Sequence, residues 1–151
     1  IRQTGGKTII DTPKGTITAD RLLIATNAYI GNLEPVTAAH VMPIRSFIGA
    51  TEPLDRFPQV LRGSEAVADS RFVVRYFRKS RDGRLLFGGR EAYTADSPRD
   101  ISSHIRRQIT ELYPALKDIE MTHAWGGSVG ITMNRQPFAR EVMPGVISGS
   151  I

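Results

Sequence analysis

The sequence of 151 residues contains no cysteine. This excludes disulfide bonds, thiolate metal sites and a cysteine nucleophile within these residues. A chain without cysteine is compatible with a reducing cytoplasm, and we expect a cytoplasmic protein. No apolar run approaches the roughly 18 to 20 residues of a transmembrane helix, so we expect no membrane partner.

Several catalytic and binding motifs are also missing. The three histidines, His40, His104 and His123, are far apart, and none begins a metal-ligand spacing such as HxxxH or HExxH. The serine nucleophile elbow GxSxG does not occur, and neither do the phosphate loops GxxxxGK(S/T) and GxGxxG. We therefore expect no metal site, and the sequence supports neither a serine triad nor a phosphate loop.

Charge is abundant but spread out. The formal net charge is +5 and the pI is about 10.0, values that suit a nucleic acid or another anionic partner. The densest basic group, "RYFRKSRDGR" at Arg75–Arg84, interleaves its charges with apolar residues at strand spacing. We therefore favour a solvated strand face over an anion-attracting cleft, and expect no nucleic-acid partner. The alternative is a non-enzymatic basic module, which would bind RNA or another anion in a salt-sensitive way.

Apolar and turn residues predict mostly strands. Lys7–Asp11 and Thr16–Asp20 flank "TPKG" and predict a hairpin, and Asp82-Gly83 predicts a second one. The run "RLLIA" at Arg21–Ala25 is typical of a strand buried on both faces. Further strands are expected at residues 42–51 and 119–132 and near Val146.

One helix is predicted, over Pro98–Tyr113. Ser102 or Asp100 can cap its start, and Pro114 stops it. Its apolar stripe consists of Ile101, Ile105, Ile109 and Leu112. The order of elements predicts an α+β fold, with a mixed, mostly antiparallel sheet covered by a helix on one face.

Two glycine pairs, Gly88-Gly89 and Gly126-Gly127, each end an apolar or aromatic strand. Such pairs predict bulges or close backbone approaches. The second pair follows Trp125, the only tryptophan, in the stretch "HAWGGSVGITMNRQP". A large ring, bare backbone and polar side chains in one short segment are unusual for a simple core strand.

Three segments in order resemble the D-amino-acid oxidase superfamily of flavoproteins, in its glycine oxidase-like branch. "TADRLLIATNAY" at Thr18–Tyr29 resembles a returning strand that passes near the flavin nucleotide. "YFRKSRDGRLLFGGREAY" at Tyr76–Tyr93 resembles paired strands of the substrate domain. "LYPALKDIEMTHAWGGSVGITMNRQP" at Leu112–Pro137 resembles the segment with Trp-x-Gly beside the flavin ring. Within the superfamily, these residues are most similar to γ-glutamylputrescine oxidoreductases.

The resemblance implies FAD as cofactor and a small-molecule amine or amino acid as substrate. It implies hydride transfer from the carbon that bears the amine to the flavin, with dioxygen as acceptor and hydrogen peroxide as product. It also implies a substrate-binding domain over residues 36–137. Residues 1–35 would belong to the FAD-binding domain, and residues 138–151 would return toward it.

The resemblance assigns two groups of site residues. The candidate catalytic residues of the substrate cavity are Trp125, Tyr76 and Arg78. The candidate cofactor-binding residues are Ala25, Thr26, Asn27, Gly126 and Gly127. A structural role on a sheet face is the alternative for Tyr76, since aromatic residues often lie there.

Val129 is informative about the substrate. Amino-acid-oxidising relatives commonly carry an arginine four residues after the tryptophan, which binds the substrate carboxylate. With valine there, an amine or polyamine-like substrate is favoured, and a glycine or sarcosine oxidase is the alternative enzyme. Arg45, Arg78 or Arg90 could supply a carboxylate clamp instead, against a structural or solvated role for each.

Ile1 opens within a strand-turn-strand pattern and Ile151 ends an apolar run, so we expect a fragment of a longer enzyme, inactive by itself. The family's glycine-rich pyrophosphate loop is not among these residues. We therefore predict a colourless polypeptide whose Kd for free FAD is no tighter than tens of micromolar, about 6 kcal/mol. Absorbance after gel filtration checks this, and a retained yellow flavin would contradict it.

Overall fold

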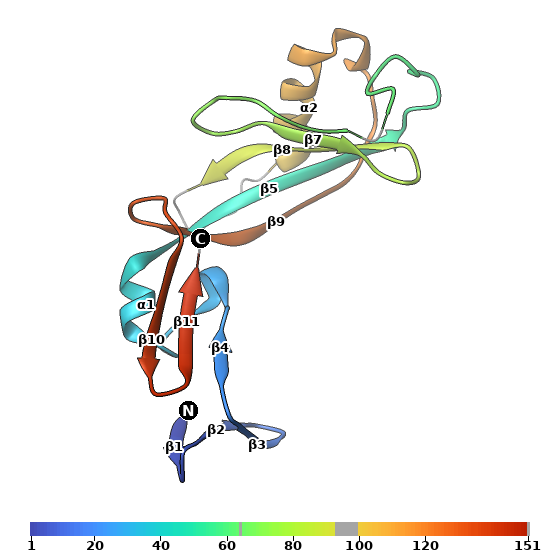
Figure 1. Cartoon of the computed structure of the whole chain (residues 1–151). Coiled ribbons are helices and arrows are strands. Elements are labelled where there is room, and N and C mark those ends of the chain that lie inside the picture. The colour runs from blue at the N-terminus through green and yellow to red at the C-terminus, as the bar shows by residue number, and fades with distance from the viewer. Residues whose placement is uncertain (64, 93–99, 151) are drawn as a thin grey trace. The chain divides into compact units, whose positions relative to one another are not determined.

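The computed structural model of the chain describes residues 1–63, 65–92 and 100–150, without the side chains of Arg90 and Glu91. Two compact units form, one from Ile1–Pro43 with Val129–Ile151 and the other from Ile44–Ser128. The helices are α1 (Pro35–His40) and α2 (Ile101–Leu112), with 3-10 helices η1 (Asn27–Tyr29) and η2 (Pro114–Leu116). The strands are β1 (Arg2–Thr4), β2 (Lys7–Thr12), β3 (Gly15–Ala19), β4 (Leu22–Ile24), β5 (Val41–Pro53), β6 (Ala66–Ala68), β7 (Tyr76–Lys79), β8 (Arg84–Ala92), β9 (Met121–Thr132), β10 (Phe138–Met143) and β11 (Val146–Ser150) (Figure 1).

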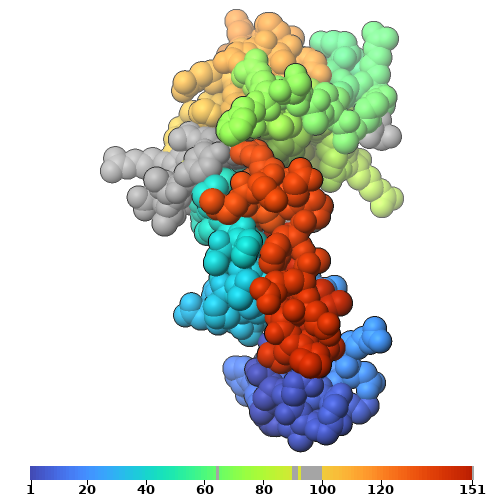
Figure 2. Space-filling view, turned by 60° about the vertical axis from the view of Figure 1, so that its left-hand side comes forward, coloured from blue at the N-terminus to red at the C-terminus, as the bar shows by residue number. Residues whose placement is uncertain are grey.

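The first unit holds two small sheets. One is the antiparallel series β1-β2-β3, which confirms the hairpin around "TPKG". The other has the order β10-β11-β4, in which β11 runs antiparallel to β10 and parallel to β4. Helix α1 lies against this second sheet (Figure 2). The hydroxyl of Thr37 on this helix donates to that of Ser148 on β11 at 2.8 Å.

Strand β4 is buried on one face, and the prediction of burial on both faces was wrong. Ile24 is 4% exposed and packs with Ile30 and Val146, whereas Leu23 is 66% exposed. Leu23 lies opposite Ile147 of β11, which is also exposed. The reason is that no element of the described residues covers this face of the sheet.

The second unit is built on the sheet β6-β7-β8-β5-β9. Strands β7 and β8 form the hairpin predicted at Asp82-Gly83, in which Gly83 adopts a φ of 82° that favours glycine. Strand β8 then pairs antiparallel with β5. Because side chains alternate along a strand, each of these strands presents one set of residues to α2 and another to the opposite face.

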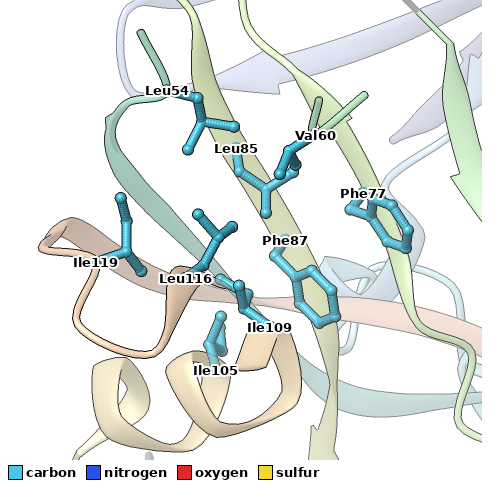
Figure 3. Packing of buried hydrophobic residues seen from close by; sticks show 9 residues of the cluster. All are labelled: Leu54, Val60, Phe77, Leu85, Phe87, Ile105, Ile109, Leu116 and Ile119. Carbon is cyan, nitrogen blue, oxygen red and sulfur yellow. The ribbon is translucent and has the colours of Figure 1, made fainter. Parts of the chain in front are cut away.

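The core lies between this sheet and α2. Leu85 and Phe87 of β8 are fully buried there, as are Ile105 and Ile109 of α2. The rings of Phe77 and Phe87 stack with centroids 5.3 Å apart. The whole cluster consists of Leu54, Val60, Phe77, Leu85, Phe87, Ile105, Ile109, Leu116 and Ile119 (Figure 3).

Helix α2 confirms the helix predicted from the apolar stripe and the cap predicted at Asp100, with one correction at Leu112. Asp100 caps it, since its carboxylate accepts from the Ser103 amide at 2.9 Å, whereas Ser102 lies inside the helix. Leu112 is 41% exposed, although it was expected in the stripe. The chain leaves the helix at that point, and Tyr113 and Leu116 pack against the core in its place. Pro98 and Arg99 lie outside the described residues.

A buried polar cluster joins α2 to the sheet. Arg75 is 5% exposed, and its Nε donates to Gln108 Oε1 at 3.0 Å while its Nη2 pairs with Glu111. Gln108 Nε2 in turn donates to the carbonyl of Gly89 at 3.1 Å. The expected solvated strand face was therefore wrong for Arg75, because its charge is neutralised by groups of α2.

The fold class is confirmed as α+β with mostly antiparallel sheets and a covering helix. The assignment of residues 1–35, 36–137 and 138–151 to cofactor and substrate domains stays a prediction. Within the described residues, no helix is both long and apolar enough to cross a membrane.

The Arg75–Glu111 pair makes stability depend on pH. The hydrogen bond from Arg75 holds the pKa of Glu111 below its ordinary value of 4.5. A lowered folded-state pKa contributes stability that is present above the unfolded-state value and is lost as pH falls through the folded-state value. We expect urea denaturation below pH 4.5 to show a steeper loss of stability for the natural protein than for Glu111→Gln. Glu120→Gln, at another exposed carboxylate, is the control and should keep the natural slope; equal slopes in all three would contradict this role of Glu111.

Candidate functional site

A cavity of about 250 Å³ opens on the second unit. Side chains alternate along β7 and β8, so Leu85 and Phe87 join the core while their neighbours point to the other face. Phe77 belongs to the core cluster and also borders the cavity. The cavity is lined by Ile48, Ala66, Val67, Tyr76, Phe77, Arg78, Leu86, Gly88 and Trp125. All three predicted catalytic residues, Trp125, Tyr76 and Arg78, are in this lining.

Cross-strand register explains why these residues meet. Gly88 of β8 lies opposite Tyr76 of β7 and opposite Ile48 of β5, which makes one row across three strands. Leu86 lies opposite Arg78, which itself lies opposite Ala66 of β6, and this makes a second row. The face therefore combines one aromatic ring, one cation and several apolar side chains.

Tyr76 lies across the bare position of Gly88. A Cβ on Gly88 would lie 2.6 Å from the Tyr76 hydroxyl oxygen, well inside van der Waals contact. Beyond Gly88 the hydroxyl of Tyr76 is 3.1 Å from that of Ser46 on β5, within hydrogen-bond distance. Sequence reasoning missed Ser46, because only the register of three strands brings it to Tyr76.

Gly89 is a bulge residue, as the glycine pair predicted. The β5–β8 register shifts between Phe47, opposite Arg90, and Ile48, opposite Gly88, so Gly89 has no partner across the ladder. Its carbonyl instead accepts from Gln108. A Cβ on Gly89 would lie 2.8 Å from Gln108 Oε1 and 3.4 Å from Arg75 Cα. The bulge is thus held from the helix side of the sheet.

Trp125 and Gly126 contact different parts of the second unit. The indole of Trp125 lines the cavity and is 45% exposed. A Cβ on Gly126 would lie 2.5 Å from Cδ1 of Phe47 and 3.1 Å from the Ser46 carbonyl. Gly126 is therefore bare because an aromatic ring of the same unit packs onto it, while Gly127 follows it as a partly buried residue of β9.

Arg78 is the charged residue of the cavity lining within the described part of the chain. Arg45, the second candidate for a carboxylate clamp, lies on β5 and is not among the lining residues. The side chain of Arg90, the third candidate, lies outside the described residues. Arg78 is exposed, so a negatively charged ligand group can reach its guanidinium.

The first unit carries a second hollow, of about 350 Å³, at the carboxyl ends of β4 and β11. Its lining is Leu23, Ala25, Asn27, Pro137, Phe138, Ala139, Gly149 and Ser150. Ligands of open parallel sheets bind outside the carboxyl ends of the strands, and β4 and β11 are the parallel pair here. The predicted cofactor-binding residues Ala25 and Asn27 are part of this lining, and their contact with a cofactor stays a prediction.

Two buried hydroxyl oxygens belong to this edge of the sheet. Thr26 Oγ1 and Ser150 Oγ are shielded from solvent and have no hydrogen-bond partner among the described residues. Buried polar groups are normally paired, so both can donate to or accept from a bound ligand. Ser150 was not predicted from the sequence, since the segment "VISGS" of β11 carries no motif that distinguishes its serines as ligand-binding residues.

Asn27 has a structural role in the first unit. Its φ of 52° is in the left-handed region that asparagine tolerates. Its Oδ1 accepts from the Ala28 amide at 2.7 Å and from the Gly130 amide. The side chain therefore fastens the turn after β4 to β9, and a Cβ on Gly130 would lie 2.8 Å from this oxygen.

Among residues 1–63, 65–92 and 100–150, no group of three or more His, Cys, Asp or Glu side chains could hold a metal ion.

Comparison with known proteins gives consistent matches. The family model described as "DAO: FAD dependent oxidoreductase" matches residues 1–149. "Probable oxidoreductase OrdL" of Rhizobium meliloti (strain 1021) is 76% identical over 146 residues, covering 97% of this chain and 34% of that protein. "Gamma-glutamylputrescine oxidoreductase" of Escherichia coli (strain K12) is 31% identical over 132 residues. The match covers 85% of this chain and 31% of that protein. The chain spans about a third of the length of these relatives.

The fold likewise matches a solved structure. Glycine oxidase from Bacillus cereus ATCC 14579 superposes with a TM-score of 0.76 at 19% sequence identity, covering 99% of this chain and 42% of that one. At this identity the likeness concerns the fold.

The two hydrogen bonds accepted by Asn27 predict that its replacement lowers stability. Asn27→Ala removes the acceptor of two backbone amides and places alanine in the left-handed region. We expect it to lower the free energy of unfolding by about 2–3 kcal/mol, from the lost hydrogen bonds and the backbone strain. Asn27→Asp is the matched control, because aspartate keeps the acceptor oxygen and tolerates this φ. Urea denaturation measures both, and equal losses in the two variants would disprove the fastening role.

Proposed function

The chain belongs to the DAO family of FAD dependent oxidoreductases, and we propose that its full-length protein oxidises a primary or secondary amine of the γ-glutamylputrescine type, with dioxygen as acceptor. The match confirms the family resemblance of the sequence. We also propose the cytoplasm as its location, since a chain without cysteine is compatible with a reducing compartment.

The residues at the carboxyl ends of β4 and β11 fit the cofactor of this family. FAD, when bound, supplies the acceptor for the hydride that leaves the amine-bearing carbon. We propose that the backbone of Ala25–Asn27 and the hydroxyls of Thr26 and Ser150 contribute to holding it. The support is the pair of buried hydroxyl oxygens without a partner at this edge.

The cavity on the second unit would hold the substrate. Apolar side chains of Ile48, Val67 and Leu86 form much of its lining, and they would displace water where they contact a bound substrate. They also disfavour a charged ammonium group, which lowers the pKa of a bound amine and favours its neutral form. A neutral amine is the form that releases hydride, so the lining would prepare the substrate without a dedicated base.

The observation that carries the proposal is that Tyr76 and Arg78 line one cavity from the same strand. Residues two apart on a strand are separated by about 7 Å along it. A substrate that places its carboxylate on Arg78 and its amine near Tyr76 therefore needs several bonds between the two groups. γ-Glutamylputrescine has this form, whereas glycine carries both groups on one carbon.

Val129 supports the same preference. It occupies the position where amino-acid-oxidising relatives carry arginine, and it is 42% exposed on β9. The glycine or sarcosine oxidase alternative would need an arginine elsewhere, Arg45, Arg78 or Arg90, to bind the carboxylate of a small amino acid. The basic anion-binding module would instead use the cations of 75–84, of which Arg75 and Arg84 already pair with protein groups.

The proposal predicts a selective effect of Arg78→Met in the full-length protein. Loss of charge-assisted hydrogen bonds should raise KM for γ-glutamylputrescine about 10- to 100-fold. KM for putrescine, which has no carboxylate, should change less than about threefold, because no contact is lost. Peroxide formation measured over a range of substrate concentrations gives both values.

Lys79→Met is the matched control, since it removes the next cation on β7, which alternation places on the other face. It should leave both KM values near those of the natural protein. Faster turnover of glycine or sarcosine than of γ-glutamylputrescine would favour the amino-acid oxidase. Salt-sensitive oligonucleotide binding without oxidation of any amine would favour the basic module.

A further inference from the structure

We propose that Ser46 is a positioning residue that fixes the ring of Tyr76 as one wall of the cavity, and that Gly88 is bare to let this bridge form. The inference deepens the proposed function and rests on it for the identity of the ligand. The contacts themselves involve residues of one compact unit.

The bridge spans a strand. Ser46 is on β5 and Tyr76 is on β7, and β8 lies between them in the sheet. Neighbouring strands are about 4.8 Å apart, so the two backbones are separated by about 9.5 Å. The hydroxyls are nevertheless 3.1 Å apart, which requires the tyrosine ring to lie across β8 instead of standing on its own strand.

Gly88 is the residue that the ring crosses. It lies directly opposite Tyr76 in the β7–β8 register, and a Cβ there would overlap the ring. Backbone conformation does not explain this glycine, because Gly88 is not among the residues with positive φ. The missing side chain is thus a requirement of the Tyr76 position.

The register beneath the ring is fixed from the other face. The bulge at Gly89 brings Gly88 opposite Ile48, two residues after Ser46. Gln108 holds the bulge carbonyl, and the buried Arg75 holds Gln108. Slippage of β8 by one residue would put Phe87 or Gly89 under the ring and expose the core face.

A fixed ring has a consequence for binding. Tyr76 is 38% exposed, so without a partner for its hydroxyl it could leave the sheet face and enlarge the cavity. Holding it in place before the ligand arrives lowers the ordering cost of binding. The expected result of losing Ser46 is therefore weaker binding of the amine with little change in the chemical step.

The test uses the full-length protein labelled with 3-fluorotyrosine, with the signal of residue 76 assigned by its loss in Tyr76→Phe. We expect Ser46→Ala to shift or broaden that fluorine resonance and Ser46→Thr, which keeps a hydroxyl, to restore it. An unchanged resonance in Ser46→Ala would overturn the inference. This readout needs no substrate, so it stands apart from the proposed function.

Kinetics on γ-glutamylputrescine give the second readout. Ser46→Ala should raise KM about threefold to tenfold, the range of one neutral hydrogen bond, and leave kcat within about twofold. In a Tyr76→Phe background the same change should add nothing, because Ser46 acts through the Tyr76 hydroxyl. A full effect of Ser46→Ala in that background would overturn the inference. A shifted resonance with unchanged KM would support the bridge and contradict the substrate role of the cavity, which is the proposed function.

Discussion

The carbonyl of Gly89 and the guanidinium of Arg75 share one partner, Gln108, and the arrangement of the second unit depends on this contact. A buried guanidinium must be paired, because an unpaired one costs several kcal/mol. Gln108 and Glu111 satisfy it from α2, and Gln108 also satisfies the carbonyl that the bulge leaves without a ladder partner. The helix is therefore joined to the sheet at the point where the register shifts. On the opposite face, the same shift sets which residues meet in the cavity.

The distribution of cations follows from this architecture. The basic segment 75–84 is one cluster of cations in the sequence, but in the structure its arginines have different contacts. Arg75 forms an ion pair with Glu111 of α2. Arg84 pairs with Asp82 and donates to the Thr51 carbonyl and the Thr122 hydroxyl. Arg78 is left facing the cavity. Within the described residues, part of this positive charge is therefore paired internally, while Arg78 lines the cavity.

Local features of the fold were readable from the sequence. Turn residues predicted both hairpins, and the apolar stripe predicted α2, because these depend on neighbours within a few positions. The exposed face of Leu23 was not predictable, since a continuous apolar run has the same appearance whether or not another element covers it. Leu112 was misplaced for a similar reason, as the stripe does not show where the chain leaves the helix.

The candidate site was predictable only in part. Resemblance supplied Tyr76, Arg78 and Trp125, which the structure brings into one cavity. Ser46 was missed because its contact with Tyr76 crosses an intervening strand, β8. The alternating pattern of residues in β5 also does not indicate the bulge on β8 that sets the register. The structural role of Asn27 was missed because its partner, Gly130, is 103 residues away.

The glycines beside the cavity have a common explanation that does not involve a ligand. Gly88 is bare beneath the ring of Tyr76, and Gly126 is bare against the ring of Phe47. Approach of a flavin to the backbone of Gly126 and Gly127 stays a prediction, but packing within the unit already requires glycine at residue 126. Adjacent residues of β9 therefore have different roles. The ring of Trp125 lines the cavity, and the missing side chain of Gly126 leaves space for the buried ring of Phe47. Packing against Phe47 is therefore sufficient to explain the glycine that follows Trp125. A cofactor that approached this backbone would contact a surface whose shape already follows from the packing of the unit.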